Sequence, residues 1–202
     1  FSKSKLSFFT HFPSLTVSLD DLSLKGSAPF KNDTLLKADQ VAFGINLKRL
    51  IFDNEVKIDE LYVSDAFINV TVNQKGEANY NVYVSKPSDK PKDTAKGGAS
   101  IKLDLIRLKN WNIKYHDLSA RVLVDAKGLN YTGKGGLSED VFDLQTDLDI
   151  DKLDFSLDRI YYAKQKTLHA DLITRINTNA LTFVLRKNEL RINELPLKFT
   201  GY

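Results

Sequence analysis

The chain of 202 residues contains no cysteine and no methionine. Without cysteine there is no disulfide, no thiolate metal site and no cysteine nucleophile, so the fold must rest on packing alone. Long apolar runs are also missing, since no stretch approaches the roughly 18 residues that a membrane-spanning helix requires. The chain begins at Phe1 and shows no signal-peptide pattern. We therefore expect a piece of a longer protein, with any membrane anchor or export signal outside it.

An excess of charge of one sign is missing too, with 29 Lys and Arg against 26 Asp and Glu. Both signs are interspersed along the chain, which is typical of a solvated surface and provides no basic patch for nucleic acid. We expect no nucleic-acid partner. The hydrophobic content of 42% is sufficient for a folded core.

What the chain does have is apolar residues at every second position, the period of a strand with one dry face. In "SLTVSLDDLSLKG" Leu15, Val17 and Leu19 alternate with polar residues, and later segments repeat this pattern. Around residues 47–53 the apolar spacing is instead that of a short helix. We predict an all-β, mostly antiparallel fold of about ten to twelve strands with one or two short helices.

Turn-forming residues divide the chain. The turn Asn73–Gly76 predicts a hairpin whose return strand is residues 77–84, and Lys187-Asn188 predicts a second hairpin turn near the C-terminus. Residues 85–100 contain proline, glycine and many charges, which predicts a flexible polar linker or loop. The resulting regions are 1–84, with the short helix near 47–53, and 101–202, which either continues the same sheet or forms a separate one.

Motifs that suggest chemistry are incomplete. The run Gly128 to Gly135 fits the start of a phosphate-binding loop, but Gly135 replaces the Ser or Thr that would hold magnesium, which favours a hairpin turn. The series Asp147, Asp149, Asp151 resembles a calcium loop without its turn glycine and fits the wet face of a strand. The three histidines have no second ligand at metal spacing. We therefore predict no enzyme activity, no catalytic residue, no metal site and no cofactor.

Ordered motifs before the linker carry a family resemblance. They are a Phe-Pro-x-Leu strand, an "F-x-x-D-T-L-L-x-A" turn, a short leucine-bearing helix, a "V-x-x-x-x-L-x-x-x-x-A-x-I-x-V" strand and "G-x-A-N-Y". In this sequence these are Phe12-Pro13-Ser14-Leu15, Phe30 to Ala38, Leu47 to Ile51, Val56 to Val70 and Gly76 to Tyr80. In this order they resemble the N-terminal region of the AsmA-like proteins of Gram-negative envelopes, especially the Bacteroidetes type. The second half is similar more loosely, through "NIKYHD", "GLNYTGKG" and "KNELRINELPLKFTG".

The resemblance implies a periplasmic β-rich body, tethered to the inner membrane by an N-terminal anchor that this sequence lacks, with a role in outer-membrane biogenesis or homeostasis. It also implies a relation to bridge-like lipid-transfer proteins, whose long curved sheets carry lipid chains in an apolar groove. We accordingly expect an elongated, strongly curved sheet or groove.

We expect a non-enzymatic domain that shields or conducts the acyl chains of phospholipid or another envelope lipid. The alternative is a structural or protein-binding β-domain with a closed core that meets envelope proteins as an assembly scaffold. The same apolar residues serve as groove lining in the first case and as core in the second. The candidate lining residues are Val41, Phe43, Ile45, Ile68, Val70, Val72, Phe183 and Leu185.

Overall fold

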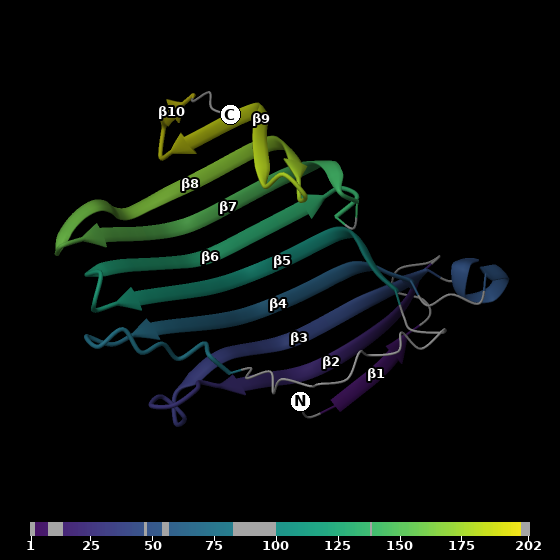
Figure 1. Cartoon of the computed structure of the whole chain (residues 1–202), viewed down its shortest axis with the longest axis horizontal. Coiled ribbons are helices and arrows are strands. Elements are labelled where there is room, and N and C mark those ends of the chain that lie inside the picture. Colours follow the sequence, from purple (N-terminus) through teal and green to yellow (C-terminus); the bar gives the residue numbers. More distant parts are fainter. Residues whose placement is uncertain are drawn as a thin grey trace.

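In the computed structural model ten strands form one sheet and follow one another in chain order (Figure 1). The structure describes residues 3–7, 14–46, 48–53, 57–82, 100–137 and 139–198. The prediction of a nearly all-β fold is confirmed. The strands are β1 (Lys3–Ser7), β2 (Ser14–Lys25), β3 (Thr34–Asn46), β4 (Lys57–Val72), β5 (Ser100–Asp117), β6 (Val122–Lys134), β7 (Val141–Leu157), β8 (Ile160–Asn177), β9 (Thr182–Ile192) and β10 (Leu195–Leu197).

Every neighbouring pair of strands is antiparallel except β4 and β5, which pair in parallel from Lys57–Ser100 to Val72–Asp117. This parallel ladder joins the two regions expected from the sequence into a single sheet. The expected linker, residues 85–100, lies outside the described residues apart from Ser100, the first residue of β5. The expected short helix is present as one turn, η1 (Arg49–Asp53), between β3 and β4.

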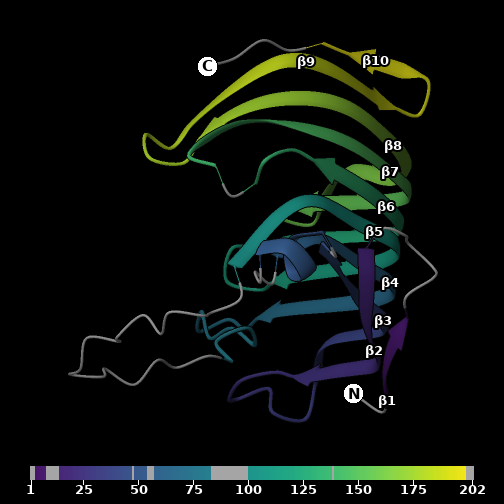
Figure 2. The ribbon, with the colours of Figure 1, turned by 90° about the vertical axis from the view of Figure 1, so that its right-hand side faces the viewer.

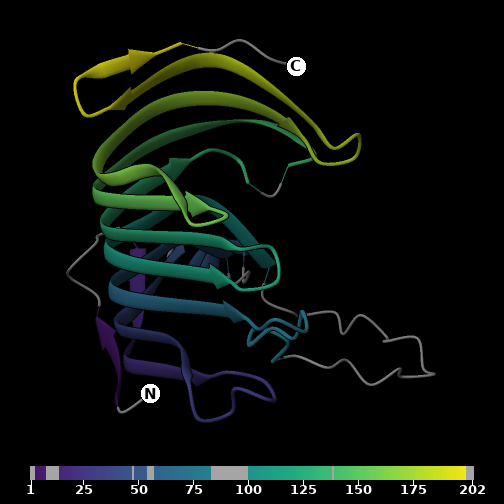
Figure 3. The ribbon, with the colours of Figure 1, turned by 90° about the vertical axis from the view of Figure 1, so that its left-hand side faces the viewer.

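The sheet is a single layer that is strongly curved. Figures 2 and 3 show the long strands bending along their length, so that the sheet forms an open arch. Among the described residues no second layer of strands or helices packs on either face. The apolar side of the sheet must therefore be buried mainly by the curvature of the sheet itself.

The alternation of apolar residues changes phase near the middle of each strand from β2 to β7. At each change two apolar residues stand three positions apart, and the register aligns Leu22, Ala38, Ala66 and Trp111 across β2–β5. A strand that adds one residue in this way keeps its apolar residues on the same face and bends more sharply. We call this line of phase changes the bend line; its residue pairs are Leu19–Leu22, Ala38–Val41, Val63–Ala66, Leu108–Trp111, Ala126–Leu129 and Ile150–Leu153.

Backbone conformation at the bend line explains which residues occupy it. Asp21, Asp65, Asn110 and Gly128 have φ values of 55°, 51°, 53° and 64° there. Asp, Asn and Gly tolerate this left-handed region better than other residues. The Asn110 amide also donates to Asp65 Oδ1 at 2.7 Å, which links the bends of β4 and β5.

The hydrophobic core coincides with the bend line. Eight buried residues form one cluster, and all of them flank a phase change. They are Ala38, Val41, Val63, Ala66, Trp111, Ala126, Leu129 and Ile150. Small residues of the other face, such as Ser18, Ala42 and Ser64, are also buried, but the hydrophobic cluster with Trp111 lies on the inside of the bend, where the two arms of each strand converge. The apolar face is therefore the concave face.

The hairpin predicted after β4 forms its turn but not its return strand. Asn73–Gly76 does form a turn, but only an isolated bridge, Val72–Ala78, follows, and residues 79–82 are not a strand. Buried Asn79 instead caps β4 through its side chain, on the side of β4 away from β5, and β3 pairs with β4 on that side from Ile68 onward. The rest of the predicted strand, residues 83 and 84, lies outside the described residues.

Two other segments that were predicted to turn lie inside strands. β9 runs through Lys187-Asn188 without turning, and the turn to β10 lies at Asn193 and Glu194. The register shifts by one residue between Ile173 and Thr174 of β8, so β9 contains one extra residue opposite this point. The apolar residues of β9 therefore change from odd-numbered to even-numbered positions at a β-bulge, and the chain does not turn there. Similarly, residues 128–134 belong to β6, where Gly128 forms the bend.

Candidate functional site

The largest continuous feature of the described chain is its apolar concave face. Cross-strand register aligns one apolar residue from each of nine consecutive strands into a single row. With strands about 4.8 Å apart, this row is about 40 Å long. Its members, from β2 to β10, are Leu19, Val41, Val63, Leu108, Tyr131, Leu148, Ala170, Leu190 and Leu197.

The candidate lining residues of β3 and β4 lie on this face. Val41 pairs with Val63, Phe43 with Leu61, and Ile45 with Ile58. Ile68 lies between Leu36 of β3 and Ile113 of β5. Val41 and Val72 are buried, whereas Phe43, Ile45, Ile68 and Val70 are half-buried.

The other two candidates are far from this group. Phe183 and Leu185 belong to β9 at the opposite side of the sheet, where Phe183 pairs with Ile176 and Leu185 with Thr174. Phe183 is 58% exposed, because β10 pairs only with Leu190–Ile192 and leaves this part of β9 at an open edge. The eight candidates therefore extend over one face and do not converge on one pocket.

Trp111 is the central residue of the face that the sequence prediction missed. It is 9% exposed, and its indole Nε1 donates to the Val63 carbonyl oxygen at 3.0 Å. The bond spans the parallel ladder and fixes the ring over the bend line. The sequence signal was the spacing Leu108–Trp111, which breaks strict alternation in the same way as Ile150–Leu153.

The opposite face is polar and charged. Lys187 Nζ pairs with Asp171, and Arg186 with Asp143 Oδ2 at 3.1 Å. His169 Nδ1 lies 2.8 Å from Asp149 Oδ1. The acidic series of β7 is thus the wet face of a strand, and the described residues contain no cluster of three or more His, Cys, Asp or Glu that could hold a metal.

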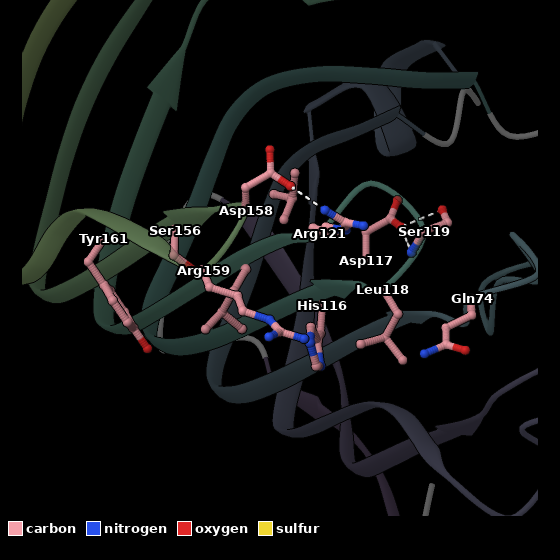
Figure 4. A pocket seen from close by; sticks show the side chains of 12 residues that line it. Gln74, His116, Asp117, Leu118, Ser119, Arg121, Ser156, Asp158, Arg159 and Tyr161 are labelled. Carbon is pink, nitrogen blue, oxygen red and sulfur yellow. Dashed lines mark hydrogen bonds and ion pairs between the residues drawn. The ribbon is translucent and has the colours of Figure 1, made fainter.

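A separate hollow of about 770 Å³ lies at the end of the sheet where β4, β5 and β7 finish (Figure 4). Its walls come from the turn after β4, the β5–β6 turn and the β7–β8 turn. His116, Leu123, Ser156 and Tyr161 pair across strands and alternate with the last residues of the apolar face, so the hollow opens on the polar side. The hollow and the apolar face are therefore different sites.

The two carboxylates in the hollow are already engaged. Asp117 Oδ1 accepts from the N–H groups of Ala120 at 2.8 Å and Ser119 at 2.9 Å, and from Ser119 Oγ at 2.7 Å. These bonds, that from Ala120 first, hold the pKa of Asp117 below its usual value. Asp158 Oδ1 pairs with Arg121 at 3.2 Å.

Arg159 differs from these groups. No hydrogen bond or ion pair joins its guanidinium to any residue that the structure describes, and its side chain extends across the hollow toward His116 (Figure 4). The hollow is thus lined by two arginines and two aspartates, and Arg159 is the one of these four whose side chain has no partner in the described part of the chain.

None of the described helical residues makes a segment long and apolar enough to cross a bilayer. Compared with protein-family models, curated proteins and solved structures, the chain gave no match in any of the three.

Proposed function

We propose that the concave face binds the acyl chains of phospholipid or another envelope lipid, and that the chain acts without catalysis. The resemblance of its ordered motifs to AsmA-like proteins supports a periplasmic location and an inner-membrane tether N-terminal to this sequence. In this account the protein shields or conducts lipid for the outer membrane, with envelope proteins as its further partners.

The observation that carries the proposal is the nine-strand apolar row on a sheet with one layer. Most of its side chains are only half-buried, and no described element covers them. Uncovered apolar surface of this length is unfavourable in water, and removing it from water stabilises by about 25 cal/mol per Å². An acyl chain is one of the few occupants that needs no hydrogen-bonding partners.

The dimensions also fit. A bilayer core about 30 Å thick holds two layers of acyl chains, so one chain spans about 15 Å. The row of about 40 Å is therefore long enough for more than one chain. Each methylene buried against it contributes about 0.8 kcal/mol, so chain length and not headgroup chemistry determines affinity.

The first experiment is purification from a Gram-negative host without detergent, followed by solvent extraction and mass spectrometry for lipid. We expect stoichiometric phospholipid above the level in a buffer blank and an unrelated protein. Ile68→Asp, which places a carboxylate on the concave face, is expected to remove most of this lipid.

The matched control is the neighbouring residue on the other face. Phe67 is 39% exposed and pairs with Lys37 and Asn112, so Phe67→Asp leaves the concave face unchanged and is expected to retain lipid. Circular dichroism and thermal unfolding check that both variants fold. Wild-type protein without lipid above the blanks would overturn the proposal and favour the structural or protein-binding domain.

A further inference from the structure

We propose that the hollow at the β5–β6 and β7–β8 turns binds a phosphate ester, with Arg159 as its principal contact. This inference goes beyond the acyl-chain proposal, because the hollow lies on the polar face and needs no groove. It stands on the charges of the lining residues, the space around them and the conformation of the β7–β8 turn.

The partners of the charged side chains favour an anion at Arg159. Asp117 and Asp158 both face the hollow, but hydrogen bonds from the β5–β6 turn hold the first and Arg121 holds the second. The guanidinium of Arg159 has no such partner among the described residues. A planar guanidinium that is free on its donor side binds phosphate and carboxylate oxygens with two parallel hydrogen bonds.

Further hydrogen-bond donors lie around this charge. The imidazole of His116 and the amide of Gln74 line the same hollow, and the Tyr161 ring closes another side of it (Figure 4). The hollow, of about 770 Å³, has room for an organic group beside a phosphate. Phosphate offers more acceptor oxygens to these separated donors than carboxylate does.

The turn that presents Arg159 is unusual. Leu157 pairs with Ile160, which leaves a two-residue loop in which Asp158 and Arg159 have φ values of 50° and 68°. Hairpin loops with both central residues at positive φ normally use glycine at the second position. An arginine held there is strained, and strained residues of this kind concentrate at binding sites.

The phosphate could belong to a soluble ester or to a lipid headgroup, and two probes separate these sources. Glycerol 3-phosphate, titrated by calorimetry, represents the soluble ester. Phosphatidylcholine vesicles with and without phosphatidylglycerol, used in a flotation assay, represent the lipid. Ile160 and Tyr162 are 61% and 65% exposed beside the turn, so Ile160→Ser is expected to weaken only vesicle binding.

Three substitutions test the site. Arg159→Gln is expected to weaken binding of the bound probe at least tenfold, and Arg159→Gly is expected to do the same while raising the thermal midpoint because it relieves the positive φ. Asp158→Asn removes a negative charge and releases Arg121, so it is expected to tighten binding. Arg191→Gln, an exposed arginine of β9 far from the hollow, is the matched control and is expected to bind like the wild type.

Binding of either probe that depends on Arg159 and is tightened by Asp158→Asn would support the site. Failure of both probes to bind the wild type, or equal losses in the Arg159 and Arg191 variants, would overturn it. Since glycerol 3-phosphate has no acyl chain and does not need the concave face, the Ile68→Asp variant is expected to bind it normally. The test of the phosphate site can therefore fail while the acyl-chain proposal holds, and the reverse is also possible.

Discussion

At the residue scale, Asn79 is the polar side chain on which the end of β4 depends most. It is fully buried, its Oδ1 accepts from Thr71 N–H at 3.0 Å, and its Nδ2 donates to the Asn69 carbonyl oxygen at 2.6 Å. Its carbonyl also accepts from Ser27 N–H at 2.8 Å, which ties the β2–β3 turn to the same point. Asn79 therefore gives the "G-x-A-N-Y" motif a structural role.

We predict that Asn79→Ala lowers the free energy of unfolding by about 3 kcal/mol, because two buried backbone groups lose their partners. Urea unfolding followed by circular dichroism measures this change. Asn81→Ala, at an exposed position two residues later, is expected to change stability by less than about 0.5 kcal/mol. Equal effects of the two substitutions would refute the capping role.

Asp117 makes stability depend on pH. Its folded pKa lies below the ordinary value of 3.8 because the carboxylate accepts hydrogen bonds from Ala120 and Ser119. A depressed folded pKa stabilises the protein above the unfolded pKa, and this contribution is lost as pH falls through the folded pKa. Asp117→Asn is therefore expected to be less stable than the wild type at neutral pH.

The difference between wild type and Asp117→Asn should shrink as the pH falls below about 4. Urea midpoints of both proteins over the range from about pH 6 to about pH 2 measure this convergence. Asp39→Asn, at an exposed position of β3, is the control substitution. A constant difference across the range would contradict the assignment.

At the scale of elements, the bend line is the feature that shapes the strands. Gly128 lies on it with φ at 64°, and a Cβ there would meet the side chain of Asp151 on β7, with the carboxylate Cγ at 2.7 Å. Gly76 also has a positive φ, 80°, but a Cβ there would meet nothing within 4 Å. Substitutions at the two glycines therefore distinguish the cost of backbone strain, which both positions share, from the cost of a steric clash, which arises only at Gly128.

We expect Gly76→Ala to lower the free energy of unfolding by about 1 kcal/mol, because alanine is strained at a positive φ. Gly128→Ala should lower it by about 3 kcal/mol, since the alanine also collides with Asp151. Thermal unfolding of both variants gives the comparison. Equal losses would mean that the close contact at the bend is unimportant.

Much of the strand content was predictable, because period-two alternation depends only on neighbouring residues. The segments around Val17, Phe43 and Val70 are strands as predicted. The errors have a common cause: a phase change in alternation can be a turn or a bulge, and only the partner strand decides. At Lys187-Asn188 the partner β8 accommodates a bulge, so β9 continues.

The site was less predictable than the strands. Alternation identified Ile68 and Phe43 as residues of a dry face, but not the bend that makes this face concave. Trp111, Asn79 and Arg159 were missed because their roles depend on Val63, Ser27 and the neighbouring turns, which are distant in sequence. A repeated spacing of three between apolar residues, flanked by Asp, Asn or Gly, was the available signal.

At the scale of the whole molecule, one parallel ladder connects the two halves of the sheet. The halves share the buried cluster, since Ala38, Val41, Val63 and Ala66 precede the connection and Trp111, Ala126, Leu129 and Ile150 follow it. We predict that they unfold together. Trp111 fluorescence, which reports on the β4–β5 junction, and far-ultraviolet circular dichroism, which reports on all strands, should give coincident urea transitions. Separate transitions would mean that the halves are independent units.

The most direct test of the concave lipid face compares two adjacent positions on β7. Leu148 belongs to the apolar row, and Asp149 points to the polar face, where it meets His169. Replacing each in turn with the photoreactive residue benzoylphenylalanine, and irradiating protein produced in a Gram-negative host, would identify which face contacts lipid. We predict lipid adducts at position 148 and none at position 149. No adduct at 148, or equal adducts at both positions, would contradict the account.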